Sequence, residues 1–454
     1  MTTLIQNGTL VSGKGQRHAD LLIEDGKIAT VGTDLTGDTV VDAAGCLVFP
    51  GFIDGHTHLD MPVSGTVTAD NFKTGSEAAL IGGTTFFIDF ATQDRGGTLA
   101  DALAVWHGRA DGSCACDYGF HMAVTDWNAR TKAELHEMAA AGVTSFKAYY
   151  AYDALMLGDA DMFDLLREMR EIGGILGVHC ENGPVLDRLR ADAVAAGHTG
   201  PAWHPRTRPP LIEGEAISRF LRLAALADAP AWIVHLSTAD GLAEIRAARE
   251  RGQRVVVESC PQYFVLDESV YETPGFEAAK YVCSPPLRPR HDQQVLWGAL
   301  EQGEIDILST DHCSFNFKGQ KELGRDDFTK IPNGMPGIEH RPTVMYTEAV
   351  ASGRITPSDL CRMLAEHPAK LFGVWDRKGS LAVGKDADVV IYDPRASFVI
   401  SAENQHQNCD YTPFEGYRTA GSVRDVFLRG MHAVQDGALV QTGQGRYVMR
   451  GKMR

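Results

Sequence analysis

Two histidines stand one residue apart at the end of an apolar run, in the segment GFIDGHTHLD at residues 51–60. If the run is a strand, side chains alternate between its two faces, so His56 and His58 point the same way. Two neutral imidazoles on one face are half of a metal site. A polar loop after a buried strand is the plain alternative, and the His-x-His pair alone does not decide between the two.

Other side chains suited to metal chemistry follow later apolar runs, namely Lys147, His179, His235 and Asp311. His179 and His235 each come after a valine that closes such a run, and either alone could be a core histidine with ordinary hydrogen bonds. Together with the first pair, these imidazoles and the carboxylate favour zinc or a similar divalent ion. His121 lies in the middle of its run, and we interpret it as structural.

Lys147 has two possible interpretations, because a buried lysine is costly unless it is paired or neutral. It could form a salt bridge with a nearby carboxylate. A desolvated lysine is also neutral more often, and hence nucleophilic, so it could capture carbon dioxide as a carbamate. Such a carbamate has two oxygens that could bridge two metal ions. Composition and spacing do not choose between these interpretations.

The elements that must position these residues form a repeating pattern. Eight short apolar runs alternate with helix-like segments: VFPGFIDGHTH, TTFFIDFATQ, DYGFHMAV, VTSFKAYYAY, GILGVHCEN, AWIVHLS, RVVVESCPQY and IDILSTDHC. This alternation predicts a parallel (β/α)8 barrel of the TIM type, whose strands are buried on both faces. The candidate residues then lie at the C-terminal ends of the strands, where such barrels perform chemistry. The long Pro-containing stretch after the seventh run is expected to be a loop over the barrel mouth.

Both chain ends differ from the middle, because each reads as short strands joined by Asn-Gly, Asp-Gly and similar turns. We therefore expect an α/β protein of two domains. Residues 51–374 form the barrel, and residues 1–50 plus 375–454 combine into a small β-sandwich.

Composition narrows the possible partners. The 454 residues carry a net charge of −16 without a basic stripe, so nucleic acid is not an expected partner. We find no signal peptide and no apolar run that approaches membrane-spanning length, so no membrane partner is expected. The nine scattered cysteines are expected to be reduced thiols. These features predict a cytoplasmic protein.

Eight motifs follow one another in the chain: FIDGHTH, GVTSFKAYYAY, GVHCEN, IVHLS, ESCPQY, SPPLR, LSTDH and IPNGMPGIEHR. Together they resemble those of the dihydropyrimidinase and D-hydantoinase branch of the cyclic amidohydrolases. The resemblance covers nearly the whole chain, including the β-sandwich split between its ends. One small departure is Cys180, where the family commonly has alanine.

The resemblance implies a role for each candidate residue. His56, His58 and Asp311 would hold one divalent ion, His179 and His235 would hold a second, and Lys147 would bridge the two as N6-carboxylysine. Zinc is the expected metal, and carbon dioxide supplies the carbamate. Tyr152 would donate a hydrogen bond to the substrate carbonyl, and Asp311 would move the proton. Ser284 and Asn333 would hold the ring amides, largely through backbone groups. A homotetramer is the assembly that the family suggests.

The implied reaction is hydrolysis of a cyclic ureide or imide, a dihydropyrimidine or a 5-substituted hydantoin, to an N-carbamoyl amino acid. Candidates for a hydrophobic pocket around the ring substituent are Met61, Val63, Tyr149, Leu155 and Met156. An allantoinase-like enzyme is the nearest alternative. Dihydroorotase commonly has an arginine where this chain has Asp60. A non-catalytic scaffold is a further alternative, although this chain retains all six expected ligands.

Overall fold

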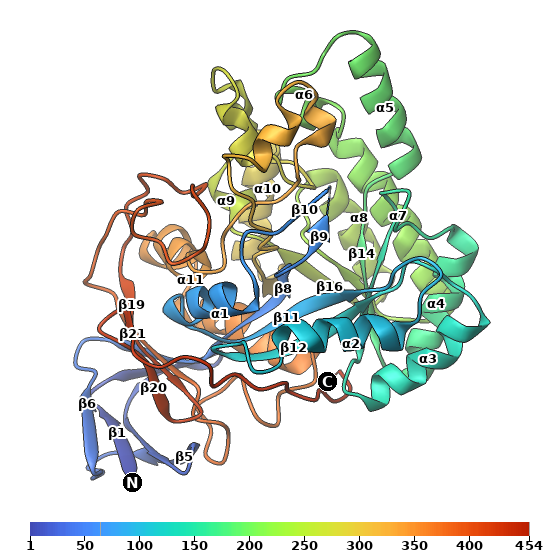
Figure 1. Ribbon diagram of the computed structural model, residues 1–454. Helices are drawn as coiled ribbons and strands as arrows, with labels where there is room; N and C mark the ends of the chain where they lie inside the picture. The colour runs from blue at the N-terminus through green and yellow to red at the C-terminus, as the bar shows by residue number, and fades with distance from the viewer. Residues whose placement is uncertain (64, 454) are drawn as a thin grey trace.

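The computed structural model describes residues 1–63 and 65–453, and an eight-stranded parallel sheet lies at its centre (Figure 1). Its strands are β8 (Phe52–Thr57), β11 (Thr84–Thr92), β12 (Asp117–Ala123), β13 (Ser145–Tyr149), β14 (Ile175–His179), β15 (Ala231–Ile233), β16 (Val255–Ser259) and β17 (Ile307–Leu308). Each coincides with one of the predicted apolar runs, and neighbours in the sheet follow chain order. The predicted (β/α)8 barrel is confirmed.

The barrel closes between its first and last strands. Thr57 of β8 forms a parallel bridge with His312, and the backbone N–H of His58 donates a hydrogen bond to the carbonyl of His312 at 2.8 Å. Because β17 contains two residues, closure depends on the chain just beyond its end. The C-terminal ends of β8 and β17 therefore lie side by side.

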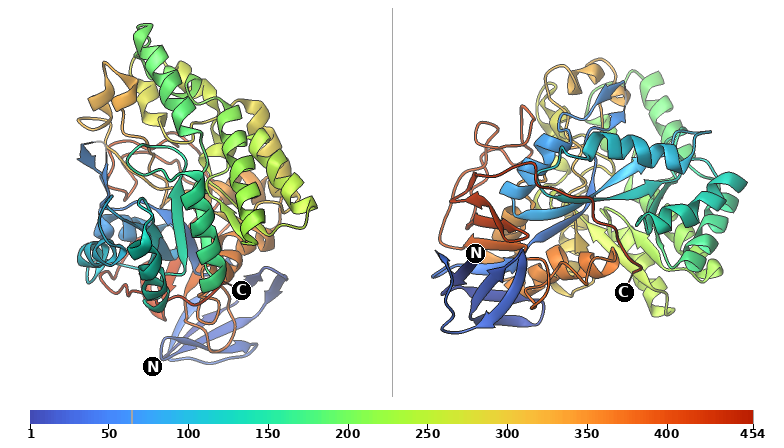
Figure 2. Two further views of the ribbon diagram at one scale, coloured as in Figure 1. Left: turned by 90° about the vertical axis from the view of Figure 1, so that its right-hand side faces the viewer. Right: turned by 60° about the horizontal axis from the view of Figure 1, so that its bottom comes forward.

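Helices follow the strands and surround the barrel (Figure 2). The longer ones are α1 (Phe72–Ile81), α2 (Leu99–Ala110), α3 (Ala129–Ala140), α4 (Asp159–Ile172), α5 (Gly183–Ala195), α7 (Pro210–Ala227), α8 (Ala239–Glu250) and α10 (Arg290–Glu301). Asn71, Thr98 and Asn128 cap the starts of α1, α2 and α3, since their side-chain oxygens accept hydrogen bonds from first-turn N–H groups.

Short elements fill the loops at the barrel mouth. The stretch after β16, predicted as a loop, contains α9 (Gln262–Val265), η1 (Glu268–Glu272) and η2 (Glu277–Tyr281). A small hairpin, β9 (Pro62–Val63) and β10 (Thr66–Val67), follows β8. The short helix α6 (Trp203–Arg206) precedes α7. After β17 come η3 (Lys321–Gly324), η4 (Phe328–Lys330), α11 (Arg341–Met345), η5 (Tyr346–Ala351), α12 (Pro357–Cys361), η6 (Arg362–Glu366) and α13 (His367–Leu371).

Two further sheets lie beside the barrel, one built from N-terminal strands alone and the other from strands of both chain ends (Figure 1). One contains, in order, β5 (Lys27–Gly32), β4 (Asp20–Glu24), β1 (Thr2–Gln6) and β6 (Thr39–Asp42). The other contains β21 (Ala438–Leu439), β20 (Met431–Gln435), β19 (Ser422–Leu428), β18 (Val389–Asp393), β7 (Leu47–Pro50), β2 (Thr9–Ser12) and β3 (Gly15–His18). Ile23 and Ile28 of the first sheet share a buried cluster with Val48 and Ile391 of the second, so the expected sandwich forms.

The last residues of the chain return to the barrel. The N–H of Val448 donates to the carbonyl of Tyr118 at 2.8 Å, and the N–H of Gly451 donates to the carbonyl of Gly373 at 2.9 Å. The tail thus crosses the base of the barrel, at the start of β12 (Figure 2). Residues 445–451, predicted within the sandwich domain, contact the barrel, and the domain boundaries at 50 and 375 remain a prediction. No helix in the described part of the chain has the length and apolar character to span a membrane.

Candidate active site

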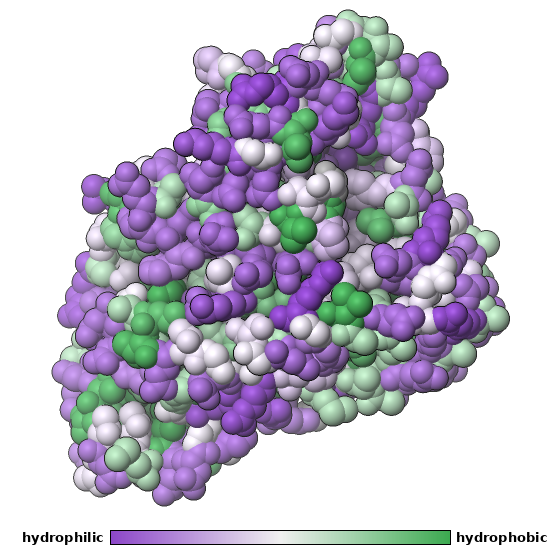
Figure 3. Space-filling model, in the orientation of Figure 1, coloured by the Kyte–Doolittle hydropathy of each residue, from purple (hydrophilic) through white to green (hydrophobic). Residues whose placement is uncertain are grey.

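A cavity of about 680 Å³ opens at the C-terminal ends of the barrel strands. It is lined by His58, Lys147, Tyr149, Tyr152, His179, His235, Ser284, Asp311 and Asn333, together with residues of the β9–β10 hairpin and α2. The surface is hollowed close to this hairpin, with apolar residues at the edge of the hollow (Figure 3). Of the described residues predicted as metal ligands or as catalytic and ring-binding groups, only His56 is not part of the lining, because it lies deeper in the barrel and is fully buried.

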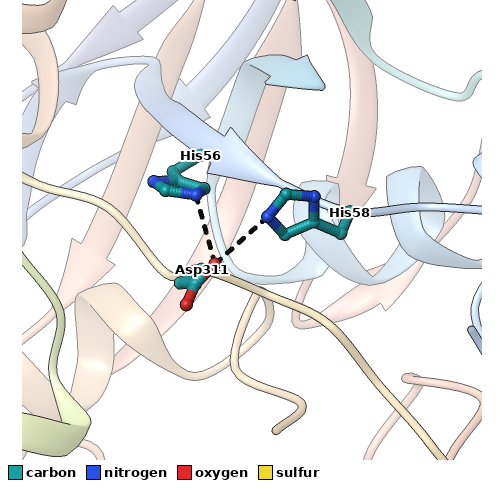
Figure 4. A group of neighbouring side chains, drawn as sticks. All are labelled: His56, His58 and Asp311. Carbon is teal, nitrogen blue, oxygen red and sulfur yellow. Dashed lines mark ion pairs between the residues drawn. The ribbon is translucent and has the colours of Figure 1, made fainter. Parts of the chain in front are cut away.

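The first cluster joins the two strands at which the barrel closes. Nε2 of His56 and Nε2 of His58 each lie 3.2 Å from Oδ1 of Asp311 (Figure 4). The three candidate ligand atoms lie within 4.8 Å of one another. The closing contact between His58 and His312 explains this arrangement, since Asp311 immediately precedes His312.

Lys147 extends from β13 toward the same cluster. Its Nζ lies 2.9 Å from Nε2 of His56 and 4.5 Å from the ring centre of Phe90. Burial lowers the pKa of Lys147 to about 8. The amine nitrogen therefore contacts an imidazole and an aromatic ring, and its neutral form is accessible near neutral pH.

His179 and His235 form a second cluster beside the first. Nδ1 of His179 lies 3.1 Å from Nε2 of His235, and the rings of His56 and His235 are centred 5.5 Å apart. The other ring nitrogen of His179, Nε2, lies 2.8 Å from Oε2 of Glu181. This contact leaves Nδ1 of His179 as the nitrogen that faces the cavity.

Burial keeps most of these imidazoles neutral. It lowers the pKa of His58 to about 4 and holds the pKa values of His179 and His235 below the ordinary histidine value. His56 is the exception. Burial and the Lys147 amine lower its pKa, but the carboxylates of Glu258 and Asp311 outweigh them, so the pKa of His56 is raised above the ordinary value. Burial opposes ionisation of Asp311, yet His56 and other neighbours hold its pKa well below the usual value. The site thus offers imidazole nitrogens and a carboxylate.

Three site residues adopt left-handed backbone conformations that are uncommon for residues other than glycine. The φ angles are 71° at Tyr152, 38° at His235 and 52° at Asp311. Such conformations cost about 1–3 kcal/mol each and persist where the surrounding structure determines them. The fold therefore aims these three side chains into the cavity at some cost in stability.

The substrate side of the cavity contains the residues predicted to hold a ring. Burial raises the pKa of Tyr152, which keeps its phenol protonated and able to donate. Oγ of Ser284 is buried without a hydrogen-bond partner among the described residues. Met61, Val63, Tyr149 and Leu155 line the cavity as predicted for a substituent pocket. Met156 is not among the lining residues of the described chain, and its side chain lies near Gly183 at the start of α5.

Three buried charged residues behind the candidate ligands, Glu258, Glu181 and Arg208, were not predicted from the sequence. Glu258 accepts from Nδ1 of His56 at 2.6 Å, and Glu181 forms a buried ion pair with Arg208. Burial would raise the pKa of Glu181, but Arg208 and His179 lower it to about 2. A glutamate within an apolar strand, as in VVVESC, was the available signal for Glu258, because a buried charge needs a partner.

The donor set fits divalent metal ions. Imidazole nitrogens with a carboxylate suit zinc and related ions. Two of the imidazoles carry carboxylate partners on their far nitrogens, a common way of orienting metal-bound histidines. His121 does not join the site, because Ser145 Oγ and the carbonyl of Gly55 occupy its ring nitrogens at 2.6 and 2.9 Å.

Known proteins resemble this chain over its full length. Residues 47–433 match the amidohydrolase family. The chain is 48% identical to a D-hydantoinase from Geobacillus stearothermophilus, with 100% of this chain and 97% of that protein covered. It is 44% identical to a D-hydantoinase from Streptomyces coelicolor, covering 99% and 98%. The crystal structure of a dihydropyrimidinase from Brevibacillus agri superposes with a TM-score of 0.99 at 47% identity, covering all of both chains.

Proposed function

Because this chain belongs to the amidohydrolase family and is a cyclic amidohydrolase of the hydantoinase and dihydropyrimidinase type, we propose that it opens 5-substituted hydantoins and dihydropyrimidines to N-carbamoyl amino acids. The resemblance seen in the sequence motifs is confirmed. The related enzymes are named D-hydantoinases, so we also propose a preference for the D enantiomer of 5-monosubstituted hydantoins.

One observation carries the proposal. Ligand-type side chains from β8, β13, β14, the end of β15 and the end of β17 meet at the mouth of one cavity, beside an apolar pocket. A few convergent polar groups in a mostly apolar pocket are typical of small-molecule sites. The volume of about 680 Å³ suits a substituted five- or six-membered ring.

The proposed cofactor is a pair of divalent ions, with zinc as the expected metal. His56, His58 and Asp311 would hold one ion, and His179 and His235 the other. Lys147, converted to its carbamate by carbon dioxide, would bridge the two. When bound, such ions supply hydroxide at neutral pH and polarise a carbonyl group.

The protein's own groups supply the remaining steps. Asp311, held ionised by its neighbours, would accept a proton from the attacking water and pass it to the leaving ring nitrogen. Tyr152 donates a hydrogen bond to the carbonyl oxygen as it gains negative charge. Ser284 and Asn333 hold the ring amides, largely through their backbone groups. The ring C–N bond then breaks, and the nitrogen leaves with its proton.

The proposed setting of the enzyme is the cytoplasm, and the proposed assembly is a homotetramer. All nine cysteines are buried and free, which suits a reducing compartment. Gel filtration with light scattering tests the assembly directly, and a monomer in solution would contradict it.

A substrate panel tests the function. Hydantoin, 5-substituted hydantoins as separate enantiomers, dihydrouracil, dihydrothymine and allantoin are each incubated with the metal-loaded enzyme, and ring opening is followed by loss of ultraviolet absorbance. We expect hydrolysis of hydantoins and dihydropyrimidines. Activity on allantoin alone would favour the allantoinase alternative, and no activity on any ring would overturn the proposal.

A further inference from the structure

A fully buried lysine lies beneath the substrate side of the cavity, outside the group of residues that the reaction requires. Lys321 begins η3 in the segment after β17, and its side chain is inaccessible to solvent. Its Nζ donates three hydrogen bonds, to the carbonyls of Val282 at 2.8 Å, Pro332 at 2.7 Å and Gly334 at 2.7 Å. All three acceptors belong to the main chain.

These carbonyls belong to the two segments that carry the proposed ring-binding residues. Val282 lies two residues before Ser284, while Pro332 and Gly334 flank Asn333. The segments also contact each other directly, because the N–H of Gly334 donates to the carbonyl of Val282 at 3.0 Å. A single ammonium group therefore lies at the junction of both segments.

The buried ammonium group of Lys321 is stable only when its three carbonyl acceptors are in place. Burying an ammonium group without a carboxylate partner is expensive, and burial lowers the pKa of Lys321 to about 8. Three short, charge-assisted hydrogen bonds offset part of that cost only while all three carbonyls keep their places. The ammonium thus favours one arrangement of the two segments over others.

Gln320, the residue before Lys321, donates hydrogen bonds to the β9–β10 hairpin on the other side of the cavity. Nε2 of Gln320 donates to Oγ1 of Thr66 at 2.8 Å and to the carbonyl of Val67 at 2.6 Å. Both acceptors belong to β10 of the hairpin whose other strand, β9, carries Val63 of the substituent pocket. Gln320 is itself fixed, since its Oε1 accepts from the N–H of Asn316 at 2.7 Å.

We propose that Lys321 is a positioning residue that fixes the two ring-binding segments relative to each other, and that its neighbour Gln320 fixes the hairpin that contacts the ring substituent. This inference rests on the proposed function. Lys321 aligns the segments that bind the ring common to all substrates, and Gln320 aligns the hairpin that contacts the variable substituent. Neither residue touches the reacting atoms.

The test compares Lys321→Met and Gln320→Ala with the control Lys330→Met, whose side chain in η4 is 69% exposed. For each variant, kcat and KM are measured on unsubstituted hydantoin and on a bulky 5-aryl hydantoin. Because hydrogen bonds to charged groups contribute more than neutral ones, Lys321→Met should raise KM at least about tenfold, by a similar factor for both substrates. Gln320→Ala should raise KM more for the bulky substrate, and the control should match wild type.

The metal content of the variant distinguishes misplaced ring-binding segments from general damage to the fold. Lys321→Met should bind metal as wild type does, because the carbonyls that it holds are not ligands. Unchanged KM values in a folded, metal-loaded Lys321→Met enzyme would overturn the inference and leave the proposed function intact. A wild-type enzyme that hydrolyses no cyclic substrate would instead overturn the proposed function.

Two further measurements apply if Lys321→Met does not fold. Lys321→Gln keeps two N–H donors and should give a smaller rise in KM for both substrates. Hydrogen exchange of the wild-type enzyme needs no variant. The amides of Ser284, Asn333 and Gly334 should exchange together with those of η3, as one cooperative unit. Independent exchange of the two segments would overturn the inference.

Discussion

Glu258 connects the two clusters of candidate ligands through one oxygen atom. Its Oε1 lies 2.6 Å from Nδ1 of His56 and accepts a hydrogen bond from the backbone N–H of His235 at 3.2 Å. Its other oxygen, Oε2, is buried and has no hydrogen-bond partner among the described residues. One carboxylate thus orients the ring of a residue in the first cluster and the backbone of a residue in the second.

We expect Glu258→Gln to weaken metal binding about 10- to 100-fold. The negative charge of Glu258 orients the His56 ring and raises the basicity of its other nitrogen, and the amide lacks this charge. Competition with a chelator of known affinity measures the change. Glu250→Gln, at an exposed position of α8, is the matched control. Wild-type metal affinity in Glu258→Gln would show that its contact with His56 is only structural.

Lys147→Ala should abolish activity, because alanine cannot form the proposed bridging carbamate. Burial lowers the pKa of Lys147 to about 8, so about a tenth of the amine is neutral at pH 7 and able to react with carbon dioxide. Addition of bicarbonate with a short carboxylic acid should restore part of the activity, measured as initial rate. Lys73→Ala, exposed on α1, should remain fully active. An active Lys147→Ala enzyme without additives would refute the bridging role.

Tyr152→Phe should lower kcat about 10²- to 10³-fold with a small change in KM, the usual effect of losing one hydrogen-bond donor to a developing oxyanion. The substitution removes one hydroxyl and leaves the aromatic ring in place. Tyr149→Phe is the comparison, since Tyr149 lines the same cavity but is assigned to the substituent pocket. A similar loss of kcat in both variants would contradict the specific role of Tyr152.

Prolonged chelation should inactivate the enzyme slowly, since the candidate ligands are mostly buried. Added zinc, manganese or cobalt should then restore activity. The midpoint of thermal unfolding should fall on metal removal, because a ligand that binds only the native state stabilises it. Calorimetry of metal-loaded and chelated protein provides a measurement that does not depend on turnover. Activity that persists through exhaustive chelation would argue against the proposed cofactor.

The sequence predicted the barrel and its rim because local patterns carry that information. Near-continuous apolar runs such as TTFFIDFATQ indicate buried parallel strands, and the barrel geometry then places their C-terminal ends at one rim. His56, Lys147 and His179 lie within strands, so their position followed directly from the pattern. The close approach of His58 to Asp311 required barrel closure, which the same pattern predicted.

The residues that the sequence did not reveal depend on contacts between distant segments. Glu258 meets His56 across 202 positions of the chain, and Lys321 meets Val282 across 39. The stretch GQKELG that contains Lys321 reads as a polar surface loop, and nothing in it indicates a buried ammonium. The path of the C-terminal tail was missed for a related reason. Residues 445–453 carry no clear strand pattern, and their position depends on hydrogen bonds with the barrel base.

Arg450 should make this tail important for stability. Its buried guanidinium donates to Oγ of Ser145 at 2.7 Å and to the carbonyl of Phe120, and Ser145 in turn contacts His121. Arg450→Met would leave these buried acceptors without a donor, at about 1–3 kcal/mol for each unsatisfied group. We therefore expect a clear decrease in the free energy of unfolding measured with denaturant.

The matched control for Arg450 is Lys452→Met, which removes an exposed cation two residues further along the same tail. It should leave the unfolding free energy within about 0.5 kcal/mol of wild type, as surface substitutions usually do. Because Arg450 lies at the base of the barrel and the cavity at its mouth, the Arg450→Met enzyme that remains folded should keep its KM. Equal stability of the two variants would mean that the tail contributes little to the barrel.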